Sequence, residues 1–142
     1  MCPHITLLIP FVPAFLIDGE IEARLRRLLA RFQPFGYSLE RLERFPGGVL
    51  YLAPEPSEPF VELVRALAAE FPDYRPYDGA HDTIVPHGTV ADSEDAELLT
   101  RIADDAEKRL PIACRVGEVT VVERGADLRW RPRAAYPLGG IE

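Results

Sequence analysis

Positive charge is scarce in this chain. Its 16 lysine and arginine residues stand against 23 aspartate and glutamate residues, which gives a net charge of −7 at pH 7 and a pI near 5.0. Sequence-independent binding of long nucleic acid depends on a basic surface that neutralises phosphates. The composition therefore argues against that class of protein, whereas a short or small phosphate-bearing ligand in a local pocket stays compatible. Lys108 is the only lysine, so nearly all positive charge comes from arginine.

Long hydrophobic runs are also missing. No stretch reaches the roughly 18 apolar residues that a transmembrane helix needs, so we expect no membrane-spanning segment. The apolar stretch of residues 5–13 lacks a basic leader and is interrupted by prolines, which argues against a secretory signal. We therefore expect a cytoplasmic protein.

Cysteine is nearly absent, with only Cys2 and Cys114 in the chain. Two cysteines are too few for a disulfide framework, and neither has the spacing of a zinc site with nearby His, Asp or Glu. We predict that both are free thiols. A metal site built on two histidines is disfavoured as well, because no third ligand lies at a suitable spacing.

One domain is expected over residues 1–142, because 47% hydrophobic content in 142 residues supports one substantial core. Within it, Pro3-His4-Ile5-Thr6-Leu7 and Pro86-His87-Gly88-Thr89-Val90 repeat one pattern, and they contain two of the three histidines. In an extended strand, residues i and i+2 point to the same face. Each motif thus presents an imidazole beside a hydroxyl.

Hydrophobic periodicity and turn residues predict an alternation of strands and helices along the chain. The expected elements are a strand over residues 4–10, a helix capped by Asp18, a hairpin around Gly47-Gly48, a helix capped by Ser57, a strand over 84–91, a helix capped by Asp92 or Ser93, and a long terminal hairpin formed by 112–122 and 128–133. A helix over 39–45 competes with the first hairpin.

The two halves therefore repeat one order of motif strand, amphipathic helix and hairpin. The motif histidines lie 83 residues apart (87 − 4), and we interpret the pattern as a diverged duplication with pseudo-repeats of about 3–55 and 84–139. Two such units related by a pseudo-two-fold axis would bring both motifs to a shared cleft.

Two imidazoles across a cleft suit phosphodiester chemistry. Because the ordinary pKa of histidine is about 6.5, one ring can accept a proton from water while the other donates to the leaving oxygen. Such a pair titrates as a unit and predicts a bell-shaped rate profile. The hydroxyls can donate to the non-bridging oxygens of the phosphate.

These motifs resemble those of the 2H phosphoesterase superfamily and, within it, the bacterial 2'-5' RNA ligase-like proteins. The resemblance covers essentially the whole chain and rests on the two His-x-Thr motifs together with residues 10–13, 50–54 and 136–139. It implies an α+β fold that is bilobal and duplicated, with two antiparallel sheets flanked by helices around a central cleft. His4 and His87 would be the catalytic residues, and Thr6 and Thr89 would bind the substrate phosphate.

The resemblance also implies an activity. Members typically open 2',3'-cyclic phosphates of RNA or nucleotides to 2'-phosphates, and some act on 2'-5' phosphodiesters, without metal or ATP. We accordingly expect no metal, no cofactor and no obligate protein partner. Gly88 and Ala91-Asp92 depart from the family pattern, which prefers an apolar residue inside the motif and a basic one after it. The alternative is a catalytically idle module of the same fold that binds a nucleotide or RNA end.

The remaining candidates have more ordinary interpretations. His81 lies outside both motifs and is expected at the surface or behind the site. Phe11, Tyr37, Tyr51 and Trp130 could each stack on a base, but core or rim packing is favoured for all four. Arg129, Arg131 and Arg133 are expected to share one solvated strand face rather than to contact phosphate.

Overall fold

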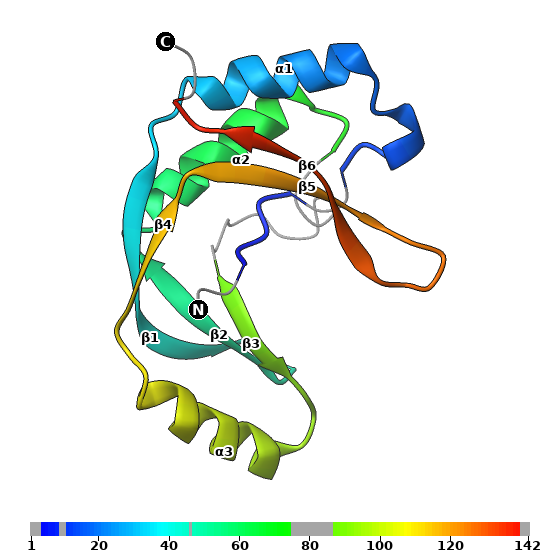
Figure 1. Cartoon of the computed structure of the whole chain (residues 1–142). Coiled ribbons are helices and arrows are strands. Elements are labelled where there is room, and N and C mark those ends of the chain that lie inside the picture. Colours follow the sequence, from blue (N-terminus) through cyan, green and yellow to red (C-terminus); the bar gives the residue numbers. More distant parts are fainter. Residues whose placement is uncertain (1–3, 9–10, 46, 75–86, 140–142) are drawn as a thin grey trace. The chain divides into compact units, whose positions relative to one another are not determined.

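The computed structural model describes residues 4–8, 11–45, 47–74 and 87–139 (Figure 1). The chain divides into two compact units, each assembled from two separate stretches. Unit 1 comprises Met1–Ile9 and Gly36–Cys114, and unit 2 comprises Pro10–Phe35 and Arg115–Glu142. The predicted pseudo-repeats remain a prediction. The part of the chain described here contains no helix long and apolar enough to cross a bilayer.

A four-stranded sheet of order β3-β2-β1-β4 forms the centre of unit 1. Its strands are β1 (Phe35–Phe45), β2 (Val49–Glu55), β3 (Gly88–Asp92) and β4 (Ile112–Val116). β2 runs antiparallel to both β1 and β3. The helices of this unit are α2 (Glu58–Glu70) and α3 (Ala96–Glu107). The predicted α+β class is confirmed.

The hairpin predicted at Gly47-Gly48 connects β1 to β2, so the competing helix over 39–45 is wrong. Both glycines have a positive φ, 95° and 96°, which residues with a side chain rarely adopt. Gly48 also lies against the chain after β3, since its carbonyl accepts a hydrogen bond of 3.0 Å from the Ser93 amide. A Cβ on Gly48 would lie 2.0 Å from the Ser93 carbonyl oxygen, whereas one on Gly47 would meet nothing within 4 Å.

This difference predicts unequal costs for two adjacent substitutions. Gly47→Ala incurs only the backbone penalty of about 1–2 kcal/mol, while Gly48→Ala adds a clash with backbone and should lower the free energy of unfolding by about 3 kcal/mol or more. Urea unfolding of the two variants measures the difference. Equal destabilisation would contradict the close approach of Gly48 to Ser93.

The two faces of this sheet differ. Tyr37 on β1 meets Phe60 of α2 edge-on at 4.9 Å between ring centroids, so α2 covers the face that Tyr37 and Leu39 share. A register shift between Leu39 and Arg41 places Arg41, Glu43 and Phe45 on the opposite face. Apolar side chains of this unit that are less than 5% exposed include Leu39, Leu50, Leu52, Phe60, Leu63, Val64, Leu67, Phe71 and Leu99.

Unit 2 packs one helix against a two-stranded ribbon. It contains the short helix η1 (Ala14–Leu16), α1 (Gly19–Ala30), β5 (Glu118–Arg124) and β6 (Trp130–Pro137). The predicted cap is confirmed, because the Asp18 carboxylate accepts a 3.0 Å hydrogen bond from the Ile21 amide. α1 lies along β6 (Figure 1). On β6, Tyr136 is 1% exposed, and the Arg26 guanidinium of α1 covers its ring at 5.7 Å from the ring centroid.

Several local predictions are corrected. The predicted strand 112–122 divides at Gly117, because β4 joins the sheet of unit 1 while β5 pairs with β6. The cap of α3 is Asp95 rather than Asp92 or Ser93, because the Asp95 carboxylate accepts hydrogen bonds from two amides of the first helical turn. The Ser93 hydroxyl instead accepts a hydrogen bond from the Asp95 amide. Ser57 stands at the start of α2 but makes no side-chain cap.

The two cysteines and the motif strands differ from expectation as well. Cys114, on β4, is disulfide-bonded rather than a free thiol, and Cys2 lies outside the described residues. Of the predicted strand 4–10, residues 9 and 10 lie outside the described part, and residues 4–8 are not in a strand, since none of the described strands forms a ladder with them. Of the predicted strand 84–91, residues 84–86 lie outside the described part, and β3 starts at Gly88.

Candidate functional site

The second motif lies at the start of β3, on the sheet face opposite α2. Thr89 is the cross-strand neighbour of Tyr51, and Tyr51 is in turn the neighbour of Glu43 on β1. Directly paired residues share a face, so Glu43, Tyr51 and Thr89 form a row across three strands. Thr89 is exposed, and His87 just before the strand is half-buried. We call this surface, with Arg41, Glu43, Phe45, Tyr51 and Thr89, the site face.

The first motif is described more sparsely. His4 and Thr6 are exposed, and Ile5 between them is half-buried. The segment belongs to unit 1, as does the second motif. All four predicted site residues therefore fall in one compact unit, although 83 residues (87 − 4) separate the two histidines in sequence. Their joint action remains a prediction.

The imidazole of His87 contacts two aromatic rings. Phe45 and Tyr51 stack on each other at 4.1 Å between centroids with an interplanar angle of 20°. His87 meets Phe45 at 5.1 Å and 84°, and Tyr51 at 5.7 Å and 72°. Perpendicular contacts at these distances are favourable arrangements of aromatic rings. These two contacts thus restrict the orientation of the imidazole ring.

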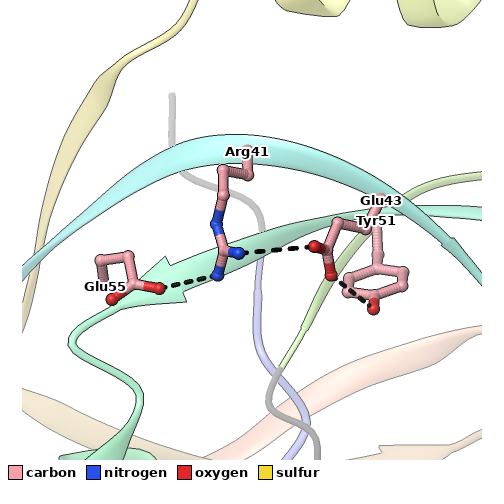
Figure 2. A network of polar contacts seen from close by, with 4 residues as sticks. All are labelled: Arg41, Glu43, Tyr51 and Glu55. Carbon is pink, nitrogen blue, oxygen red and sulfur yellow. Dashed lines mark hydrogen bonds and ion pairs between the residues drawn. The ribbon is translucent and has the colours of Figure 1, made fainter.

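A polar network continues from Tyr51 along the same face (Figure 2). The Tyr51 hydroxyl donates a 2.9 Å hydrogen bond to Glu43 Oε2. The guanidinium of Arg41 lies 3.5 Å from Glu43 Oε1 and donates a 2.8 Å hydrogen bond to Glu55 Oε1. These ion pairs are about half exposed, and such pairs typically contribute only about 0–1 kcal/mol of stability. Their main consequence is therefore the orientation of Glu43.

The pKa of Tyr51 is raised above the ordinary tyrosine value, first by burial and then by the hydrogen bond to Glu43. Burial also raises the pKa of Tyr37 and that of Tyr136. A raised pKa in the folded state favours the protonated phenol, so the stabilisation is complete below the unfolded pKa of about 10 and is lost as pH rises through the folded value.

We therefore expect the free energy of unfolding to fall as pH rises above about 10. Part of this fall should disappear in Tyr51→Phe, which has no phenol to ionise at that position. Urea unfolding of the wild type and the variant across the alkaline range measures the effect. A variant with an unchanged alkaline slope would contradict the assignment to Tyr51.

The other sequence candidates have different environments. Tyr37 is a core residue, and Trp130 is 54% exposed. Arg129 precedes β6, Arg131 makes a bidentate pair with Asp127, and Arg133 donates to the Ile17 carbonyl. The pair with Arg131 lowers the pKa of Asp127. The predicted solvent exposure of the three arginines is confirmed, but only Arg131 and Arg133 lie on the strand.

The remaining sequence candidates are His81, Phe11 and a metal site. His81 lies outside the described residues, and Phe11 is half-buried. Among residues 4–8, 11–45, 47–74 and 87–139, no group of three or more His, Cys, Asp or Glu side chains is arranged to hold a metal ion.

Sequence reasoning found Tyr51 but missed its companions. A signal for them exists in the alternation Arg41-x-Glu43-x-Phe45, which places three side chains on one strand face. The short turn at Gly47-Gly48 pairs Phe45 with Val49 and hence Glu43 with Tyr51. Counting back from the turn would have identified the Glu43–Tyr51 pair before the structure was known.

Comparison with known proteins gives a consistent result. The model of the 2'-5' RNA ligase superfamily matches residues 2–128. The crystal structure of E. coli LigT in apo form shares the fold with a TM-score of 0.54 and 20% sequence identity, covering 86% of this chain and 70% of that one. No curated protein matches the chain.

Proposed function

Because this chain belongs to the 2'-5' RNA ligase superfamily, we propose that it is a metal-independent phosphodiesterase that uses His4 and His87 as a general acid/base pair. Its substrates would be 2',3'-cyclic phosphates, or 2'-5' phosphodiesters, at the ends of short RNA or on nucleotides. The acidic composition favours such small phosphate-bearing substrates over long nucleic acid.

The proposed reaction on a 2',3'-cyclic phosphate proceeds by in-line attack of water. One imidazole takes a proton from water, and the oxygen of that water forms a bond to phosphorus. The bond from phosphorus to the 3'-oxygen breaks, and the other imidazole donates a proton to that oxygen. The product is a 2'-phosphate with a free 3'-hydroxyl, and the two histidines exchange protonation states before the next turnover.

The threonine hydroxyls have a separate role in this proposal. Thr6 and Thr89 donate hydrogen bonds to the non-bridging oxygens of the phosphate, where negative charge concentrates in the transition state. Thr89 is exposed on the site face beside buried Tyr51, so its side chain is accessible to a ligand. The same donors hold phosphorus in line between the two imidazoles.

One observation carries the proposal. Both His-x-Thr motifs of a 2'-5' RNA ligase superfamily member fall within unit 1, and the imidazole of the second is held by two aromatic rings rather than left to rotate freely. A purely structural role for either histidine would not explain why the His-x-Thr pattern occurs twice in the same unit.

The direct test is incubation of the purified protein with an oligoribonucleotide that ends in a 2',3'-cyclic phosphate. Chromatography of the products should show complete conversion to the 2'-phosphate. Tight binding of the same oligonucleotide with no product after long incubation would contradict the proposal and favour the idle binding module.

A further inference from the structure

We infer that Arg41, Glu43 and Tyr51 form a positioning chain that fixes the imidazole of His87 for proton transfer. The inference rests on the proposed function, because it assigns the chain to the same histidine. None of the three residues needs to touch substrate. They are positioning residues, and their effect passes through the Tyr51 ring.

The ring geometry shows why Tyr51 controls His87. The centroids of Phe45, Tyr51 and His87 form a triangle with sides of 4.1, 5.1 and 5.7 Å. If His87 lay beyond one end of the stacked pair, its distance to the farther ring would approach the sum of the other two. It therefore lies beside the pair and contacts both rings. A rotation of the Tyr51 ring would change the space available to the imidazole.

The hydroxyl of Tyr51 is the point at which the ring is anchored. It donates to Glu43 Oε2, while the other oxygen of that carboxylate faces Arg41. Arg41 is in turn held by Glu55 on the neighbouring strand. With both oxygens engaged, the Glu43 carboxylate has one preferred orientation, and so has the phenol that it binds (Figure 2).

The arrangement follows from the sheet register. Glu43 and Tyr51 are directly paired across β1 and β2, and Tyr51 is directly paired with Thr89 on β3. The network thus lies on the site face, away from the core face that α2 covers. A network whose role was only to stabilise the fold would have no reason to end on the ring that contacts His87.

The test compares Tyr51→Phe with Tyr37→Phe. Both variants remove one phenolic hydroxyl from a buried tyrosine of the same sheet unit, but only Tyr51 contacts His87. For a 2',3'-cyclic phosphate substrate, Tyr51→Phe should lower kcat by about 5-fold with KM changed less than about 2-fold, because proton transfer depends strongly on alignment. Tyr37→Phe should leave kcat unchanged. Equal kcat values for the two variants would overturn the inference.

A double-mutant comparison tests the order of the chain. Glu43→Ala should lower kcat about as much as Tyr51→Phe, and the double variant should be no worse than either single variant. Glu43→Gln, which keeps an acceptor for the phenol, should recover most of the activity. A further loss in the double variant would mean that Glu43 acts by another route and would overturn the inference.

A spectroscopic readout separates this inference from the proposed function. The ring protons of His87, assigned by their loss in His87→Gln, should shift in NMR spectra of Tyr51→Phe and Glu43→Ala but not of Tyr37→Phe. These shifts in a protein that hydrolyses no substrate would uphold the positioning chain and refute the phosphodiesterase. Full activity with unshifted His87 protons in Tyr51→Phe would do the reverse.

Discussion

Replacing His87 by glutamine is expected to lower kcat for opening a 2',3'-cyclic phosphate by about 10²- to 10⁴-fold. Glutamine is similar in size to histidine and can still form hydrogen bonds, but it neither accepts nor donates a proton near neutral pH. His4→Gln should have an effect of similar size. Because the proposed reaction uses both imidazoles in one step, the double variant should lose far less than the product of the two single losses.

Two comparisons make this result specific to catalysis. His81→Gln changes the one histidine outside both motifs and should keep normal turnover. Urea unfolding should show that His87→Gln still folds, with a loss of only about 1 kcal/mol from the aromatic contacts of this half-buried side chain. Normal turnover in either motif variant would refute the two-histidine mechanism.

Thr89→Val should lower kcat by about 10- to 100-fold, with a smaller change in KM. Valine has nearly the same shape as threonine and suits a strand, but it cannot donate a hydrogen bond to phosphate. The expected loss is smaller than that for His87 because Thr6 still supplies one donor in the proposed site. Steady-state kinetics on the same cyclic phosphate measures both constants.

Thr89→Ser and Thr100→Val provide the matched controls. Serine keeps the hydroxyl and should recover most of the activity lost in Thr89→Val. Thr100 is exposed on α3, where its hydroxyl donates to the Ala96 carbonyl of the same helix, so its replacement by valine should leave turnover unchanged. If Thr89→Val and Thr89→Ser were equally impaired, the loss would not come from the hydroxyl.

The sequence was sufficient for features that depend on local patterns. The Gly47-Gly48 turn, the Asp18 cap and the apolar stripes of α1 and α2 all follow from residue types at fixed spacings. The two His-x-Thr motifs and the family to which they point were also visible at that level.

Features that depend on partners distant in sequence could not be predicted from the sequence. Nothing in the alternation over residues 112–122 indicates that β4 joins β1 while β5 pairs with β6, because strand pairing is a tertiary choice. The disulfide state of Cys114 depends likewise on which residue the fold brings next to it.

The aromatic contact of His87 with Tyr51 shows both what the sequence could predict and what it could not. His87, just before β3, and Tyr51, on β2, lie far apart in the sequence, so the sequence does not show that their rings meet. Only the register of β1 and β2 could have been counted from the turn. Predicting the contact of Tyr51 with His87 also required the pairing of β2 with β3, and β3 lies far from β2 in the sequence.

The proposed reaction is the opening of a cyclic phosphate by two histidines without a metal ion. It is tested most directly by phosphorus NMR of a ribonucleoside 2',3'-cyclic phosphate incubated with protein that has been exhaustively dialysed against EDTA. We predict steady conversion to the 2'-phosphate at the untreated rate, and no conversion by the His4→Gln/His87→Gln double variant. Loss of turnover after EDTA with recovery on adding a divalent cation, or unchanged turnover in the double variant, would contradict the proposal.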